Sequence, residues 1–336
     1  MAMNNEVLAG NAIKKKGARE FLSELWIVLV FVIIYVIFSC IEPLCLTLPF
    51  WSSTLNYMTE VLILGVGVMF VVITGGIDLS IGPVEGCIGV ASALIIKAML
   101  PVMGIPAAIT VGVLSALGMG ALIGAVNAFV ITKMKLAPFI ATLGMSVILT
   151  GLGYVFNNGL EVVGLPRELT NFGNYQVFGF LSVTTIISLI VCAIFGLILH
   201  FTKFGVHTYA YGSNAESTKR AGINTNKLLF KVYILCSVLA ALAGMTLVFR
   251  FNTGSPLAGQ NVTLYAIAAC VIGGTSVMGG KGRMVGTLIG ALIISILVTG
   301  LVMLGIQTYW QQVATGLIII FAVFTDQLRH KRDTAV

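Results

Sequence analysis

Apolar runs long enough to cross a lipid bilayer recur along the whole of this 336-residue chain. A helix needs about 20 residues to span the hydrocarbon core, where its backbone must satisfy its own hydrogen bonds. Hydrophobic residues make up 58% of the sequence and charged residues 9%, against roughly 25% charged in soluble domains. The sequence therefore predicts an all-α integral membrane protein without a soluble domain. Its 38 glycines suit close helix packing in lipid.

We expect ten membrane spans. They cover residues 25–41, 57–74, 82–100, 106–132, 137–157, 181–201, 228–250, 261–279, 284–304 and 308–325. The fourth run is too long for one straight crossing, so we expect it to be tilted or broken. The first run is too long for the apolar part of a signal peptide and no A-x-A site follows it, so we expect it to remain as a span.

Lysine and arginine indicate how these spans are oriented, because cytoplasmic loops carry an excess of both. With ten spans and a cytosolic N-terminus, only Lys97, Arg167 and Arg250 of the 19 basic residues fall outside. This distribution predicts both termini in the cytosol, with a cytosolic segment at 1–24, a single transmembrane domain at 25–325 and a cytosolic tail at 326–336. It accounts for the formal charge of +7 without nucleic-acid binding.

Two glycine-rich stretches, Thr74–Pro83 and Gly273–Arg283, interrupt the apolar rhythm. Irregular backbone persists at membrane depth only where protein buries it or water reaches it, and interrupted segments in corresponding halves point to a transport pathway. The alternative is two ordinary turns, which Lys281 and Arg283 favour for the second stretch because they place its end at the cytosolic surface. The candidate pathway residues are Gly75, Gly76, Asp78, Ser80, Gly82, Gly273 and Gly274.

Asp78 and Glu85 are the acids nearest to membrane depth, where ionisable groups are candidates for function. Asp78 and Ser80 also suit the N-cap of the next helix, with Pro83 in its first turn, and Glu85 suits the positive end of the helix dipole. We expect capping to be the larger effect for Asp78, and a transport role is the alternative.

The sequence shows no catalytic or nucleotide-binding set. Gly279–Arg283 lacks the Lys-Ser/Thr ending of a phosphate-binding loop, and there is no Ser-His-Asp set, zinc spacing or C-x-x-C. We therefore expect a non-catalytic protein without cofactor or metal. It also lacks the chain of buried acids and histidines of a proton-coupled carrier, so uphill transport would need energy from another subunit.

The largest inner loop, 203–227, is a candidate docking site for that subunit. Ser213 or Asn214 can cap a short helix there and Gly222 can end it. The alternative is a solvated connection between two spans. The candidate coupling residues are Asn214, Ala215, Glu216, Lys219, Arg220, Ala221 and Gly222.

Several ordered motifs carry a family resemblance. They are Thr74–Gly82, Pro138–Gly144, Phe204-Gly205, Tyr211–Asn214, Ala221–Asn224, Ala266–Ser276, Gly279–Gly290 and Tyr309–Gln312. With these motifs the chain resembles the permease subunits of bacterial ABC importers for monosaccharides, the ribose, galactose and xylose group. The resemblance extends from about Leu25 to Phe324.

The resemblance implies a permease that crosses the inner membrane and pairs with a second copy or a paralogue. A cytosolic ABC ATPase subunit with two nucleotide-binding domains would drive it, and an extracytoplasmic sugar-binding protein would supply it. The resemblance places the coupling helix on Asn214–Gly222. Outer charges are then candidates for docking the binding protein, with a solvated loop as the alternative. They are Glu161, Arg167, Glu168 and Arg250.

The chain departs from the family pattern at one place. Family members tend to read Tyr-Glu-Leu-Asp before Ala-Ile-Ala, whereas Val262–Tyr265 contains neither acid. This difference bears on which solute is transported or on how the binding protein docks. Another small polar solute, such as autoinducer-2 or a nucleoside, is therefore the alternative within transport. A membrane enzyme or a stand-alone channel is the alternative from other classes. The missing catalytic set argues against the enzyme, and the docking loop argues against the channel.

Overall fold

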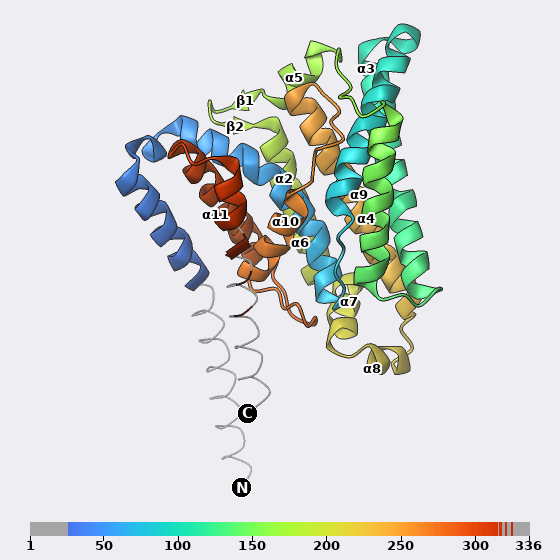
Figure 1. Ribbon diagram of the computed structural model, residues 1–336. Coiled ribbons are helices and arrows are strands. Elements are labelled where there is room, and N and C mark those ends of the chain that lie inside the picture. Colours follow the sequence, from blue (N-terminus) through green and yellow to red (C-terminus); the bar gives the residue numbers. More distant parts are fainter. Residues whose placement is uncertain (1–25, 315, 318–319, 321–323, 325–336) are drawn as a thin grey trace.

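The computed structural model describes residues 26–314, 316, 317, 320 and 324, and this part of the chain is a helical bundle (Figure 1). The helices are Trp26–Ile41, η1 (Pro43–Leu46), α2 (Leu48–Ile73), α3 (Ile81–Thr132), α4 (Pro138–Phe156), α5 (Arg167–Gly173), α6 (Val183–Phe201), α7 (Lys203–Ser213), α8 (Ala215–Arg220), α9 (Thr225–Phe251), α10 (Val262–Ile272) and α11 (Met284–Met303). Strands β1 (Gln176–Val177) and β2 (Leu181–Ser182) form an antiparallel hairpin. Helix resumes at residue 308.

Six of these helices are long and apolar enough to cross a membrane, and Trp26–Ile41 and α10 are shorter apolar helices. One of the six, α3, consists of two legs, because Gly104 inside it has φ 75° and ψ 173°. The legs correspond to the third and fourth expected spans. Of the two alternatives expected for 106–132, tilted or broken, the break is not there, since Gly104 is the residue of α3 with non-helical torsions. The prediction of an all-α membrane protein is confirmed.

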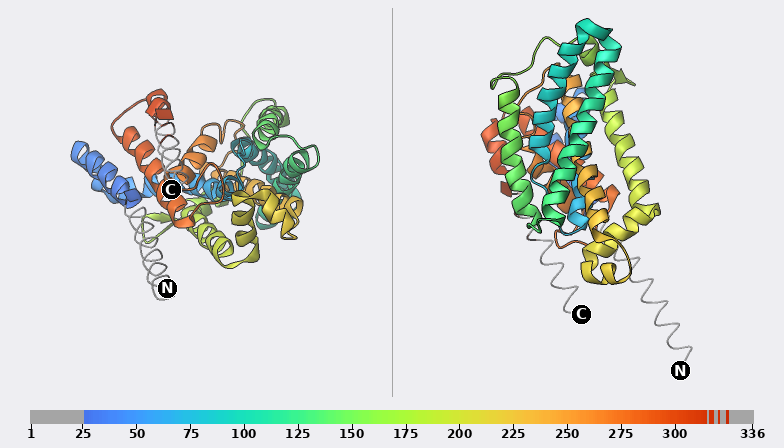
Figure 2. Two further views of the ribbon diagram at one scale, coloured as in Figure 1. Left: turned by 90° about the horizontal axis from the view of Figure 1, so that it is seen from below. Right: turned by 90° about the vertical axis from the view of Figure 1, so that its right-hand side faces the viewer.

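Helices α2 and α9 form the centre of the bundle. Every apolar side chain of α2 from Val61 to Ile73 is at most 1% exposed, and α9 packs against both α2 and α3. The outer helices instead present apolar side chains outward, among them Val155 of α4 and Phe201 of α6, which are 71% and 76% exposed. Figure 2 shows the first helix and α11 on one side of the bundle and α3 and α4 on the other. A buried centre with an apolar exterior is the arrangement that a lipid environment favours.

The two ends of the bundle differ. One end carries α8 and the turns after α3 and α10, and we call it the α8 face (Figure 1). The opposite end carries α5 and the β hairpin, and we call it the α5 face. The connection 157–182 lies on the α5 face, where Asn174 Nδ2 donates to the carbonyl oxygen of Arg250 at 2.9 Å.

Helix α2 begins nine residues before the expected start of its span. The polar residues of its first turns are typical of a loop in the sequence, but their side chains form hydrogen bonds within the protein. The Ser52 hydroxyl accepts from Gln176 Nε2 at 3.1 Å, and Asn56 Oδ1 accepts from the Ser182 hydroxyl at 2.6 Å. The β hairpin thus satisfies the polar side of this helix. Conversely, α10 ends at Ile272, earlier than expected, because the glycines after it start a turn.

Two segments break the helices inside the bundle. Residues 74–80 join α2 to α3, and residues 252–261 lead from the end of α9 into the start of α10. The two segments meet where Gly82 lies against Gly259, and the Gly82 N–H donates to the Thr263 hydroxyl at 3.0 Å. The N-terminal ends of α3 and α10 therefore lie together within the bundle, although more than 170 residues separate them in sequence.

The contact between Gly82 and Gly259 leaves no room for a side chain. A Cβ atom at Gly82 would collide with the carbonyl oxygen of Gly259, which is backbone and cannot rotate away. We expect Gly82→Ala to destabilise the protein by about 1–3 kcal/mol, the usual range for overpacking. Thermal unfolding in detergent or nanodiscs would measure this. Gly118→Ala is the matched control, because nothing lies within 4 Å of a Cβ there, and equal unfolding temperatures for the two variants would contradict the expectation.

The two faces also give a test of orientation. In a cysteine-free background, a cysteine at position 213 on the α8 face should react with a membrane-impermeant maleimide only from the cytosol. A cysteine at position 174, on the α5 face, should react only from outside, because the basic residues gather at the other end. Labelling of both positions from one side would show that the number of crossings between them is even.

Candidate solute pathway

The first break, 74–80, is mostly buried, although Gly75 is exposed, and the protein supplies partners for several of its backbone polar groups. Thr142 of α4 donates its hydroxyl to the Ile77 carbonyl and accepts from the Leu79 N–H, both at 3.1 Å. Gly75 has φ 75°, a conformation that favours glycine. One threonine side chain thus replaces two backbone partners that a continuous helix would have supplied.

Asp78 stabilises this break from within. Its Oδ1 accepts from the Ser80 N–H at 2.9 Å and from the Ser80 hydroxyl at 2.6 Å. The Ser80 oxygen in turn accepts from Asn127 Nδ2 at 2.9 Å, and all three side chains are at most 1% exposed. The N-cap residue of α3 is Ser80, and its side chain makes no cap hydrogen bond. Asp78 therefore holds the turn that precedes the helix and does not cap the helix itself, which corrects the expected geometry.

The second break, 252–261, lies in the connection between the expected spans 228–250 and 261–279. It starts at the α5 face, where Asn252 has a left-handed backbone and Gly254 forms a two-way bridge with Val162. It then enters the bundle as far as Gly259. The sequence signals this break by glycine, proline and polar residues before an apolar helix. It does not show how deep in the bundle these residues lie.

The glycines of the other expected break lie elsewhere. Gly273 and Gly274 begin the turn between α10 and α11 on the α8 face. Farther along this turn the Gly280 N–H donates to the Ile73 carbonyl at 2.8 Å, and Tyr209 of α7 donates to the Gly282 carbonyl at 2.7 Å. Burial raises the pKa of the Tyr209 phenol against the opposing influence of Arg283, so this donor keeps its proton. The turn therefore connects α7 with Ile73, after which the first break begins.

A cavity of about 560 Å³ lies beside the second break, toward the α5 face. Its walls come from the first turns of α2, the end of α9, the second break, α10, the end of α11 and the helix that starts at residue 308. Polar lining residues predominate: Ser53, Asn56, Tyr57, Glu60, Arg250, Gln260, Asn261, Tyr265, Thr299, Thr308 and Gln311. Its volume falls in the range of about 300–1,000 Å³ that is typical of small-molecule sites. The N-terminal ends of α3 and α10 lie nearby and add partial positive charge.

Two opposite charges line this cavity. Arg250 Nη1 donates to the Asn56 carbonyl at 2.7 Å, and its guanidinium faces Glu60. Arg250 was expected at the outer rim with Glu161, Arg167 and Glu168. Those three side chains are exposed on the α5 face, whereas Arg250 is half-buried in the cavity wall. Sequence reasoning missed Glu60, although an acid within a span is a recognised signal.

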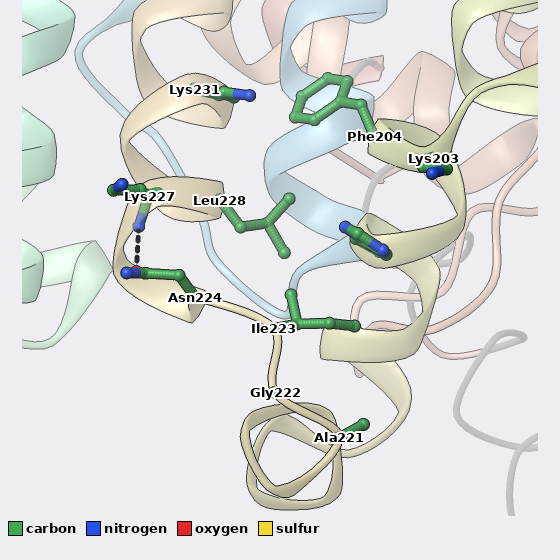
Figure 3. A pocket seen from close by; sticks show the side chains of 10 residues that line it. Lys203, Phe204, Ala221, Gly222, Ile223, Asn224, Lys227, Leu228 and Lys231 are labelled. Atoms are coloured by element: carbon green, nitrogen blue, oxygen red, sulfur yellow. Dashed lines mark hydrogen bonds between the residues drawn. The ribbon is translucent and has the colours of Figure 1, made fainter.

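The short helix α8 has the predicted caps. The Asn214 side chain accepts from the Ser217 N–H at 2.8 Å, and Gly222 ends the helix with φ 84°. Glu216 and Arg220 form an ion pair at 2.6 Å with both side chains about three-quarters exposed. A groove of about 390 Å³ lies beside α8, between α7 and α9. Lys203, Lys227 and Lys231 are among the side chains that line it (Figure 3). The prediction of a capped helix in the loop 203–227 is confirmed.

Comparison with known proteins also indicates a membrane transport protein. Residues 50–323 match the family model described as branched-chain amino acid transport system / permease component. The ribose import permease protein RbsC of Escherichia coli K12 is 37% identical over 92% of this chain and 97% of its own length. RbsC of Bacillus subtilis is 39% identical over 86% of both chains. The galactose/methyl galactoside import permease protein MglC of Haemophilus influenzae is 33% identical over 96% of this chain and 99% of its own.

No solved structure matches the chain. The family model nevertheless covers most of the sequence, including both breaks, the cavity and α8. The chain is a multi-pass membrane protein and belongs to the branched-chain amino acid transport system / permease component family, in which its relatives are sugar import permeases.

Proposed function

We propose that this chain is the permease subunit of a bacterial ABC importer for a monosaccharide and that the two breaks with their cavity form its solute pathway. The observation that carries the proposal is the polar cavity beside the joined N-terminal ends of α3 and α10. Discontinuous helices whose ends point at a polar site are a recurrent way to bind a solute inside a membrane. The names of the relatives, which import ribose, galactose or fructose, support a monosaccharide.

The charges support a cytosolic α8 face. The basic residues of this face are Lys133, Lys135, Lys203, Lys219, Arg220, Lys227, Lys231, Lys281 and Arg283. Only Lys97, Arg167 and Arg250 of the described basic residues lie toward the α5 face. By the positive-inside rule the cavity then opens to the outside of the inner membrane. Ten crossings and cytosolic termini are part of the proposal.

Helix α8 is in position to contact a cytosolic ABC ATPase with two nucleotide-binding domains. Its exposed residues project from the α8 face, and it directly follows α7. The end of α7 lies against the turn after α10, where a Cβ at Gly280 would meet the Ser213 side chain. That turn bonds to Ile73 at the base of the first break. In the proposed mechanism, a displacement of α8 would be passed to the pathway through these two contacts.

The opposite face would receive the extracytoplasmic sugar-binding protein, with Glu161, Arg167 and Glu168 exposed there. Pairing with a second copy or a paralogue in the membrane completes the proposed assembly. Import of autoinducer-2 or a nucleoside is the second candidate function, because Tyr265, which replaces the family's acid, lines the cavity.

An uptake assay tests the proposal. Cells that lack their own importers for ribose, galactose and fructose should take up at least one of these labelled sugars when they express this chain with its ATPase and binding protein. Uptake should stop when the ATPase carries a Walker A lysine-to-alanine substitution. Uptake of only autoinducer-2 or adenosine would support the second candidate, and uptake that survives the ATPase substitution would overturn the ABC mechanism.

Coupling is tested at α8. Glu216→Lys reverses an exposed charge, and Gly222→Pro imposes a negative φ where the backbone has φ 84°. The ion pair that Glu216 makes is exposed, so its loss costs only about 0–1 kcal/mol and the fold should persist. We expect both variants to insert normally and to lose sugar uptake per ATP hydrolysed. Lys133→Glu, an exposed charge reversal on the same face, is the control, and normal uptake by both α8 variants would contradict the coupling role.

A further inference from the structure

Glu85 is enclosed within the bundle in the first turns of α3. Its side chain is 0% exposed, and neither carboxyl oxygen receives a hydrogen bond from an N–H or hydroxyl group of the described residues. The group in contact with it is another carboxyl, that of Glu60 on α2. Two carboxyl groups can make a hydrogen bond only if one of them carries a proton, since a carboxylate is an acceptor alone. A hydrogen bond between Glu60 and Glu85 therefore requires one shared proton between α2 and α3.

The surroundings of the two acids differ and decide which one carries the charge. Glu60 lines the cavity and faces the Arg250 guanidinium, whose position is fixed by its bond to the Asn56 carbonyl. Glu85 has no cation beside it among the described residues. Tyr57 and Tyr265, with ring centroids 6.4 Å apart, are the other titratable groups that face the pair. Because a buried charge persists only where it is compensated, the arrangement favours Glu60 as the carboxylate and Glu85 as the acid.

This arrangement leaves Glu60 free to bind a solute. If a protonated Glu85 donates to the Glu60 carboxylate, that carboxylate still has lone pairs available to a solute in the cavity that it lines. Hydrogen bonds from a hydroxyl to a carboxylate are shorter and about twice as strong as those between neutral groups. The one positive and one negative charge of the lining compensate each other, which suits an uncharged solute with several hydroxyl groups.

We propose that Glu60 binds the hydroxyl groups of the transported solute and that Glu85 is a positioning residue, which holds the Glu60 carboxylate by donating its carboxyl proton to it. The proposal rests on the proposed function and names the contact by which the pathway recognises a sugar.

Direct binding tests it. Saturation-transfer NMR on the full chain in nanodiscs measures weak binding of D-ribose, D-galactose and D-fructose without the partner proteins. Glu60→Gln should weaken binding of the sugar that the unaltered chain prefers by about tenfold or more, the cost of losing a charged hydrogen bond. Glu161→Gln, an exposed position on the α5 face, is the control and should bind as the unaltered chain does.

Two variants of Glu85 separate positioning from simple packing. Glu85→Gln keeps an N–H donor for Glu60 and should retain binding within about twofold, whereas Glu85→Leu removes the donor and should weaken binding about as much as Glu60→Gln. Leucine suits an apolar interior, so thermal unfolding should show that Glu85→Leu remains folded. Rescue by glutamine but not by leucine in two folded variants supports the positioning role.

The outcomes that overturn the inference are distinct from those that overturn the proposed function. If the unaltered chain binds a sugar and Glu60→Gln binds it equally well, or if Glu85→Gln fails as badly as Glu85→Leu, the inference is wrong and the permease function stands. If none of the three sugars binds to the unaltered chain, the assignment of the cavity as a sugar pathway is wrong, and the inference falls with it.

Discussion

A helix that is interrupted inside a membrane exposes backbone N–H and C=O groups that no water can reach, and the rest of this structure depends on how those groups are satisfied. At the first break the Thr142 hydroxyl and the Asp78 carboxylate serve as the partners. At the second break Val162 pairs with Gly254, and where the two breaks meet the Thr263 hydroxyl accepts from the Gly82 N–H at the start of α3. These partners lie in four different segments, so the breaks fix how α3, α4, α10 and the connection 157–182 are arranged.

The meeting of the two breaks also gathers polar groups beside them. Helix starts that meet inside a bundle bring N–H groups and partial positive charge to one point. The cavity next to this point contains donors and acceptors from six parts of the chain, together with one Arg and one Glu that balance each other. In the proposed pathway, a solute that loses its hydration shell on entry would find polar groups to replace water on several walls, without a net charge to hold it permanently. Weak, many-sided binding of this kind suits passage more than storage.

Much of the fold follows from the sequence because lipid imposes strict rules. The apolar runs located the long described helices, and the caps at Asn214 and Gly222 marked α8 correctly. The polar start of α2 was missed because Ser52 and Asn56 find their partners in the distant β hairpin. The second break was missed because local composition does not reveal depth. A stretch such as Ser255–Gly259 reads equally well as a surface loop or as a segment inside the bundle. Asp78 was recognised, but its exact partner, Ser80, depends on a backbone turn that sequence spacing does not define.

The contact between Gly280 and Ile73 has a mechanical consequence. It joins backbone to backbone, and the neighbouring contact of Gly212 with the Ile73 carbonyl is of the same kind. Backbone contacts have none of the slack that side-chain rotation introduces, so the linkage between the α8 face and the first break is stiff. If α8 docks the ATPase as proposed, a small movement at this face would be enough to displace the backbone of the first break.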